Sequence, residues 1–223
     1  MSSQHIKRGQ RNELSFHNDR PEETCLAWAK LLKLVEQAAE DGRETFEPGA
    51  ELEWDDWTKI TTLPASIGKL KNVRSMLLYG SNLVSIPLQI GDMTSLTKLD
   101  LYTSYRLHWL PYEIVRCGNL TDTRLSTRAL YGNYKFRPPF PRLRPYVQGF
   151  EPETCSVCDE LFDKFTDHRP QQFWLSLKVG SDVLPLLVHA CSKACVERLP
   201  SPSAGYIAKP HKGGLGQAQP KLR

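Results

Sequence analysis

Four cysteines in the C-terminal third of the chain have the spacing that best fits a defined chemistry. Cys155-Ser-Val-Cys158 places two thiols close together, and Cys191-Ser-Lys-Ala-Cys195 begins 33 residues later. Two such pairs are the pattern of a tetrahedral Zn²⁺ site, because each tight turn can donate two thiolates. We therefore expect a structural Zn²⁺ ion bound by Cys155, Cys158, Cys191 and Cys195.

Other interpretations of these cysteines stay open. They could form disulfides or be buried free thiols. A redox-active pair is disfavoured because no predicted strand leads directly into a helix at Cys155. His168 and His189 are spare candidate ligands, although we expect His189 to pack within a strand. A closed site of four thiolates has no position for water or substrate, so this zinc is expected to fold its domain and not to catalyse.

The segment between the two cysteine pairs predicts the elements that position them. Phe173–Val179 and Val183–Val188 have the composition of strands, and Gly180 lies in the turn between them. Cys191 opens a predicted short helix, with Ser192 near its cap and Cys195 one turn later. This order of knuckle, hairpin and helix resembles a treble-clef zinc finger, and the resemblance implies a small zinc module.

An internal repeat occupies the middle of the chain. Leu63-Pro-Ala-Ser-Ile67, Ile86-Pro-Leu-Gln-Ile90 and Leu110-Pro-Tyr-Glu-Ile114 recur at intervals of 23 and 24 residues. The recurrent proline excludes one long amphipathic helix. Residues 50–62 are interpreted as a partial first copy with its strand at Leu52-x-Trp54.

These motifs resemble the leucine-rich repeat family in its Leu-Pro-x-x-Ile-Gly variety, which bacterial and plant intracellular proteins share. The resemblance implies that each copy contributes one short strand and one return segment to a stack. Ser81 and Ser104 stand where this family usually has asparagine. The expected fold class is α/β: a short leucine-rich repeat solenoid with an N-terminal capping helix and a C-terminal small zinc-binding β-hairpin/helix module.

The capping helix is predicted from an apolar stripe over residues 19–42, with Asn18 or Asp19 as its cap and Gly42 as its stop. A partner-binding amphipathic helix is the alternative interpretation. The expected organisation in chain order is a flexible N-terminus (1–18), the capping helix region (19–49), repeats (50–137), a Pro-rich connector (138–150), the zinc module (151–200) and a disordered basic tail (201–223), of which residues 205–207 could dock on the zinc module.

Composition and charge restrict the classes of function. The net charge is +4, and the tail accounts for all of it through Lys209, Lys212, Lys221 and Arg223. Four dispersed charges are more typical of a solubilising segment than of a phosphate-binding arm. No apolar run approaches the length of a membrane span, the first residues do not resemble a secretion signal, and free cysteines fit a reducing compartment. We expect a cytoplasmic protein without a membrane partner, and the charge pattern disfavours nucleic acid.

No catalytic motif stands out in the sequence, so we expect a protein that is not an enzyme. The acidic group at Glu51–Asp56 is interpreted as a solvated surface. Outward positions on the predicted strands would form a protein-binding patch on the concave face of the repeats. Its predicted residues are Glu53, Asp55, Leu77, Tyr79, Asp100, Tyr102 and Arg124.

The primary functional hypothesis is therefore a non-enzymatic protein that binds another protein on this face. Small bacterial proteins of the resembled family include effectors and immunity proteins that bind and block a toxin. The resemblance implies such a role here as an expectation. Tyr79 and Tyr102 could also simply pack as a cross-strand aromatic pair. The alternative hypothesis, from another class, is a nucleic-acid-associated protein that grips phosphate with the zinc module and the basic tail.

Overall fold

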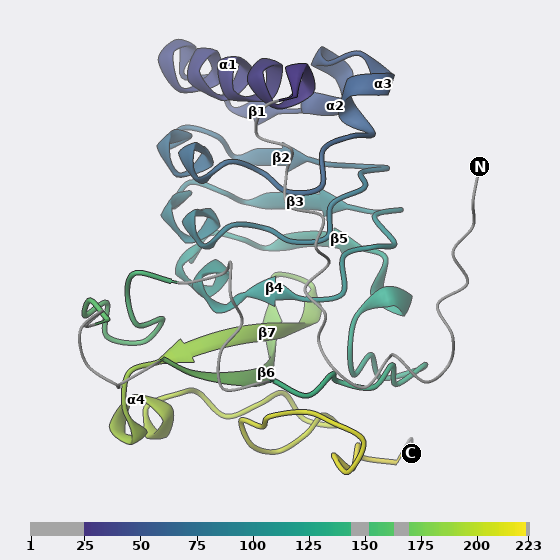
Figure 1. Ribbon diagram of the computed structural model, residues 1–223, viewed down its shortest axis with the longest axis vertical. Coiled ribbons are helices and arrows are strands. Elements are labelled where there is room, and N and C mark those ends of the chain that lie inside the picture. The colour runs from purple at the N-terminus through teal and green to yellow at the C-terminus, as the bar shows by residue number, and fades with distance from the viewer. Residues whose placement is uncertain (1–24, 144–151, 163–169, 222–223) are drawn as a thin grey trace.

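The structure is a computed structural model that describes residues 25–143, 152–162 and 170–221 (Figure 1). Its elements are short apart from the first helix and the last two strands. In chain order they are α1 (Leu26–Asp41), β1 (Thr45–Phe46), α2 (Pro48–Glu51), α3 (Trp54–Trp57), η1 (Ala65–Lys69), β2 (Ser75–Leu77), η2 (Leu88–Asp92), β3 (Lys98–Leu101), β4 (Leu110–Pro111), η3 (Tyr112–Arg116), β5 (Asp122–Leu125), η4 (Thr127–Ala129), β6 (Gln171–Val179), β7 (Asp182–Ala190) and α4 (Lys193–Glu197).

Four of the strands form a parallel sheet in the order β1-β2-β3-β5. Ser75 lies opposite Lys98, and Lys98 lies opposite Asp122, so from β2 to β5 the chain returns to this sheet after 23 and then 24 residues. The return segments contain the 3₁₀ helices η1, η2 and η3, which lie one below another in Figure 1. An extended proline precedes each of them, because its fixed φ favours the start of a helical turn but prevents a longer helix upstream.

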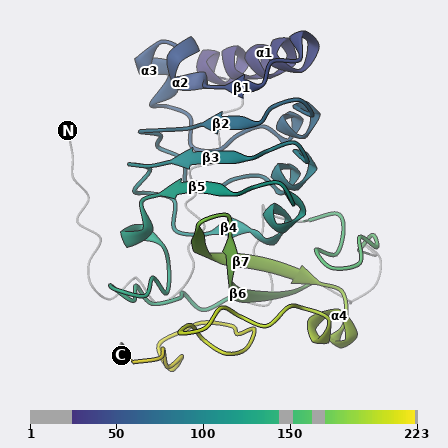
Figure 2. The ribbon, with the colours of Figure 1, turned by 180° about the vertical axis from the view of Figure 1, so that it is seen from behind.

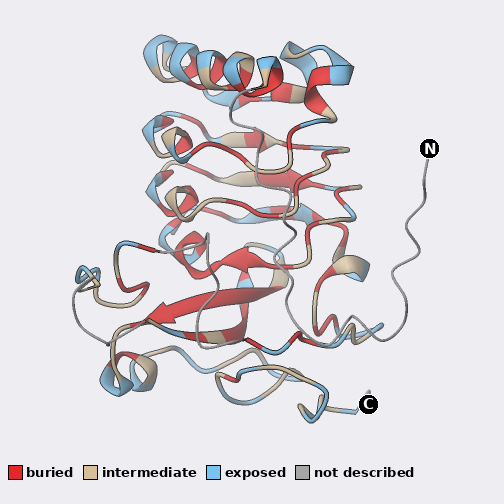
Figure 3. Cartoon of the chain, viewed as in Figure 1, coloured by how far each residue is buried: buried red, intermediate tan, exposed pale blue. Residues whose placement is uncertain are grey.

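One hydrophobic core runs through most of the molecule. It extends from Leu31 in α1, through Met76 and Leu99 in the parallel sheet, to Leu186 in β7, and all four side chains are buried. Figure 3 shows these buried segments facing inward between the sheet and the return segments. Burial of each such side chain contributes about 1.5–3 kcal/mol to folding, so this core holds the N-terminal and C-terminal parts together.

The C-terminal strands belong to a second, mixed sheet in the order β4-β7-β6. β6 and β7 form an antiparallel hairpin along their full length. β4 adds to β7 in parallel, with Leu110 opposite Leu186 and Pro111 opposite Leu187. The hairpin is therefore built into the body of the protein.

The tip of this hairpin covers the edge of the parallel sheet at Thr123 in β5. The Oγ1 of Thr123 accepts from the backbone N–H groups of Ser181 and Asp182 at 3.2 and 3.1 Å. Ser181 Oγ donates to the carbonyl of Thr123 at 2.7 Å. Gly180 has φ +59°, and a Cβ there would lie 2.7 Å from Thr123 Cγ2, so a glycine is needed at this close approach. An edge strand that could pair with another chain is covered in this way.

The predicted fold class, a short leucine-rich repeat solenoid with an N-terminal capping helix and a C-terminal zinc-binding β-hairpin/helix module, is wrong. The chain has a mixed α/β fold with one parallel and one mixed sheet and few helices. The third copy of the motif supplies β4, which pairs with the hairpin, and the partial first copy holds the end of α2 and all of α3 where a strand was predicted. The physical reason is that side chains of the return segments and of the β6–β7 hairpin pack in one hydrophobic core. The hairpin is therefore part of the same folded body and not a module of its own.

The ends of the chain also differ from the sequence-based expectation. α1 begins at Leu26, where the Sγ of Cys25 accepts from the backbone N–H of Trp28 at 3.4 Å, and it ends at Gly42. The predicted caps Asn18 and Asp19, the N-terminus 1–18, His168 and residues 144–150 of the connector lie outside the described residues. In the tail, the backbone groups of Trp174 and His211 exchange two hydrogen bonds, of 2.8 and 3.1 Å, so this segment follows the edge of β6.

Candidate metal centre and binding surface

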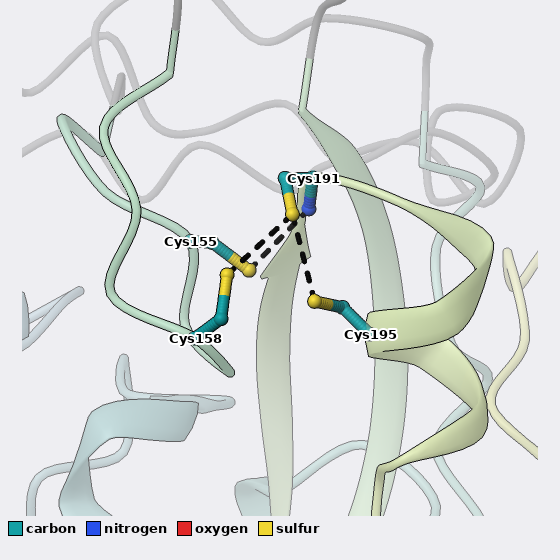
Figure 4. A group of neighbouring side chains, drawn as sticks. All are labelled: Cys155, Cys158, Cys191 and Cys195. Atoms are coloured by element: carbon teal, nitrogen blue, oxygen red, sulfur yellow. Dashed lines mark hydrogen bonds between the residues drawn. The ribbon is translucent and has the colours of Figure 1, made fainter.

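A tight turn before the second sheet presents the first two cysteines. The Thr154–Leu161 bridge closes this turn. Inside it, the N–H of Cys155 donates to the carbonyl of Glu160 at 2.9 Å, and the N–H of Asp159 donates to the carbonyl of Cys155 at 3.0 Å. These bonds hold Cys155 and Cys158 on the same side of the turn (Figure 4).

The second pair follows β7 directly. Cys191 lies just after the end of the strand, and Ser192 caps α4 by accepting from the N–H of Cys195 at 3.2 Å. The helix then places Cys195 one turn on, facing Cys191 (Figure 4). The predicted short helix with a serine cap therefore positions this pair.

The four cysteines come together in one cluster. Their Sγ atoms all lie within 4.8 Å of one another. The Sγ of Cys191 lies 3.6 Å from that of Cys158 and 3.5 Å from that of Cys195, and no disulfide joins them. Four sulfur atoms at these distances could hold a metal ion, and this is the one such group of histidine, cysteine or acidic residues in the described part of the chain.

The electrostatics of the cluster favour a bound cation. Burial by itself raises the pKa of Cys155, but the backbone N–H groups of Val157, Cys158 and Cys191 together lower it to about 7. The N–H of Glu160 lowers the pKa of Cys158, but burial and the three neighbouring cysteines outweigh it and raise that pKa to about 12. The thiolate of Cys155 therefore forms readily, whereas Cys158 needs a nearby positive charge to ionise.

The cysteine turn is anchored to the rest of the fold through Ser156. Its N–H donates to the carbonyl of His189 at 2.8 Å, and its Oγ accepts from the N–H of His189 at 3.0 Å. Arg116 at the end of η3 donates to the carbonyl of Ser156 at 3.3 Å and pairs with Asp159. Sequence reasoning missed Ser156 and Arg116, because no spacing in the sequence links residues 40 positions apart.

His189, the spare candidate ligand, is not part of the cluster. It is buried in β7, and its Nε2 lies 3.1 Å from Nε2 of Gln172. Burial lowers the pKa of His189 to about 4, so the ring is neutral near pH 7. His189 is therefore a buried residue of the strand and does not lie where it could bind a metal with the four cysteines.

A second group of predicted residues meets on the outer face of the parallel sheet. Leu77, Asp100 and Arg124 are matched across β2, β3 and β5, and Tyr79 and Tyr102 follow the first two of these strands. We call these five residues the sheet-face patch. The side chain of Tyr79 is 56% exposed and that of Tyr102 is 40% exposed, and their ring centroids lie 6.0 Å apart.

Asp100 and Arg124 hold the second tyrosine of this patch in place. The Cζ of Arg124 lies 4.6 Å from the ring centroid of Tyr102, and its Nη1 lies 3.4 Å from Oδ2 of Asp100. The Oδ1 of Asp100 accepts from the backbone N–H of Tyr102 at 3.0 Å. Asp100 is buried, so it supports the patch from beneath.

The acidic rim that the sequence predicted is not on a strand. Glu53 caps α3, and Asp55 lies within that helix. Both residues are exposed. The strand before this point is β1, formed by Thr45–Phe46, so the acidic residues do not continue the rows of the sheet-face patch.

No protein-family model matches the chain, and no curated protein matches it. The resemblance to leucine-rich repeats therefore stays a prediction. None of the helices among the described residues has the length and apolar character needed to span a bilayer.

Proposed function

We propose that this protein is a non-enzymatic binding protein that recognises another protein through the sheet-face patch. The observation that carries the proposal is the arrangement of Tyr79 and Tyr102 beside the Asp100–Arg124 pair. Tyrosine and arginine are favoured at the energetically dominant positions of protein interfaces.

The patch is organised before any partner arrives. Tyr102 is restrained by the guanidinium of Arg124 above its ring and by the Asp100 carboxylate at its backbone N–H. A side chain that is already fixed loses little rotamer entropy on binding, and that loss costs about 0.5–1.5 kcal/mol for each side chain that must be ordered. This restraint supports a binding role over a purely structural aromatic pair, because a structural pair would be covered.

We propose further that the metal is Zn²⁺ and that its role is structural. With a Zn–S distance of about 2.3 Å, neighbouring sulfurs of a tetrahedral site lie about 3.8 Å apart. The Sγ distances of 3.5 and 3.6 Å from Cys191 fit this value after small side-chain adjustments. Four thiolates complete the coordination, so the metal would fix the cysteine turn to α4 and β7. Thiolate ligands also support the expected cytoplasmic, reducing location.

A capture experiment with matched variants tests the binding proposal. The native protein and the Tyr79→Ala/Tyr102→Ala double variant are immobilised, and retained proteins from a lysate are identified by mass spectrometry and then titrated in purified form. We expect the double variant to bind the identified partner at least about thirtyfold more weakly, which corresponds to about 2 kcal/mol.

The control is Leu26→Ala, because Leu26 is 69% exposed but lies at the start of α1, outside the parallel sheet. Equal binding by all three proteins would refute the assignment of the surface. The narrower role of blocking a toxin predicts that the captured protein is itself toxic and is inhibited by the complex.

A further inference from the structure

The positive charge of the chain is concentrated in two segments that contain no acidic residue. Residues 123–150 and 198–223 hold 11 of the 29 Lys and Arg residues and none of the 25 Asp and Glu residues. The rest of the chain, with 18 basic and 25 acidic residues, is net negative. A separation of charge on this scale creates a local field that attracts anions.

The fold brings these two segments side by side. The N–H of Leu143 donates to the carbonyl of Lys212 at 2.7 Å, and the N–H of Gly214 donates to that of Phe140 at 2.9 Å. Arg137 Nη2 donates to the carbonyl of Gly205 at 3.0 Å. Figures 1 and 2 show the described parts of these segments after β5 toward the end of the molecule opposite α1.

We call seven exposed charged or aromatic residues of these segments, together with the half-buried Arg137, the basic face. The hydrogen bonds above join the two segments, so the face contains residues of both. Its members are Arg128, Tyr134, Lys135, Phe136, Arg137, Arg142, Lys209 and Lys221.

Three cations of the basic face are not neutralised by any carboxylate of the described residues. Within the described residues, Arg128, Lys135 and Arg142 make no ion pair. Elsewhere on the surface, by contrast, Arg43 pairs with Asp41 and Arg116 pairs with Asp159. These three cations are therefore available to form ion pairs with a bound anion.

Exposed aromatic rings are interleaved with these cations. Tyr134 is 57% exposed, and Phe136 is 50% exposed. The ring centroid of Phe136 lies 5.2 Å from Cζ of Arg128 and 5.7 Å from Nζ of Lys135. A half-exposed ring flanked by cations can stack on a nucleobase while the cations meet the adjoining phosphates.

We propose that the basic face binds single-stranded nucleic acid, with Arg128, Lys135 and Arg142 contacting phosphates and with Tyr134 and Phe136 stacking on bases. The rings favour a single strand because a duplex keeps the faces of its bases stacked on one another. This surface is separate from the sheet-face patch, so the proposal does not depend on the proposed function.

The test uses the purified full chain and a fluorescently labelled oligothymidylate of about 15 nucleotides, a length that matches the larger sites of single-strand binders. Fluorescence anisotropy gives the affinity over a range of salt concentrations. One variant removes three of the cations: Arg128→Gln/Lys135→Gln/Arg142→Gln. Each lost phosphate contact to a single strand contributes about 0.7 to the slope of log K against log salt, so the magnitude of this slope should fall by about 2. The affinity should fall about 100-fold at about 0.1 M salt.

The matched control removes the same charge elsewhere through Lys33→Gln/Lys69→Gln/Lys193→Gln, three exposed positions in α1, η1 and α4. Its affinity should stay within about threefold of the native value, since nearly all contact to phosphate would be kept. Equal losses in both triple variants, with unchanged unfolding temperatures, would mean that only net charge matters and would overturn the proposal.

The aromatic contribution is tested separately with Tyr134→Leu and Phe136→Leu. Each should weaken binding about fivefold or more without changing the salt slope, because stacking does not release counterions. The proposal is also overturned if the native protein binds a duplex of equal length as tightly, or if it binds phosphatidylserine vesicles or an oligoglutamate peptide but not the oligothymidylate.

Discussion

Replacing Thr123 by valine removes one hydroxyl group and leaves the shape of the side chain almost unchanged. The Oγ1 of Thr123 accepts from the backbone N–H groups of Ser181 and Asp182 and lies 3.2 Å from the carbonyl of Val179. A hydroxyl has two acceptor lone pairs and one hydrogen, so it can satisfy these three groups together. The variant leaves two donors and one acceptor of the hairpin tip without this partner.

The expected cost follows from these three bonds. A hydrogen bond of this kind contributes about 1 kcal/mol, so the free energy of unfolding should fall by about 3 kcal/mol. For a chain of this size each kcal/mol corresponds to about 2–4 °C, which gives a decrease of about 6–12 °C in the unfolding temperature.

Urea titration and thermal unfolding followed by circular dichroism measure these quantities. Amide hydrogen exchange at Ser181 and Asp182 should also accelerate, because their N–H groups lose an acceptor. Thr94→Val is the control, since Thr94 is exposed and its side chain makes no hydrogen bond with the described residues. A loss for Thr123→Val no larger than that for Thr94→Val would refute the idea that the hairpin tip stabilises the sheet edge through this hydroxyl.

Three other predictions concern the metal centre, the core and the tail. Freshly purified, reduced protein should contain about one equivalent of Zn²⁺ per chain, and Cys191→Ala should lose both the metal and the folded C-terminal part. Elemental analysis measures the metal, and limited proteolysis reports the folding. Native protein without metal would contradict this prediction. Leu101→Ala should lower the free energy of unfolding by about 2–5 kcal/mol, because Leu101 is fully buried in β3; a loss below about 1 kcal/mol in urea titration would contradict that placement. Burial lowers the pKa of His211 to about 4, so its contribution to stability is complete above the ordinary histidine pKa of about 6.5 and is lost as the pH falls through about 4. The loss should reach about 3 kcal/mol, with faster amide exchange at Trp174, and His211→Gln should remove this part of the pH dependence.

The positions of several strands could be predicted from local patterns. The alternation around Met76 and Leu99 indicates short strands, and β2 and β3 lie there. The two cysteine pairs and Ser192 also predict their neighbours, because a tight turn and a capped helix are local structures. For the same reason the sheet-face patch could be anticipated at Tyr79 and Tyr102.

The parts that failed depend on contacts between distant residues. Nothing local in Leu110-Pro111 distinguishes it from the earlier Leu-Pro motifs, yet it pairs with β7 because the hairpin occupies the position of its next neighbour. Leu52-x-Trp54 is a local exception: it has the spacing of a strand, but Pro48 starts a helical turn just before it. Composition predicted a disordered tail in which residues 205–207 could dock; Ile207 packs against the cluster of Phe140 and Trp174, and His211 contacts both of these residues as well.

The docking of the hairpin tip on Thr123 has a consequence for the synthesis of the chain. Thr123 and Ser181 are 58 residues apart, so the open edge of β5 leaves the ribosome well before the segment that covers it. At about 5–20 residues per second this interval lasts roughly 3–12 s. During that time β5 can pair with another nascent chain. Such mispairing would begin on polysomes, because neighbouring ribosomes hold unfinished copies of the chain close together. A chaperone that holds the growing chain over this interval would raise the yield of native protein more than one that acts after release.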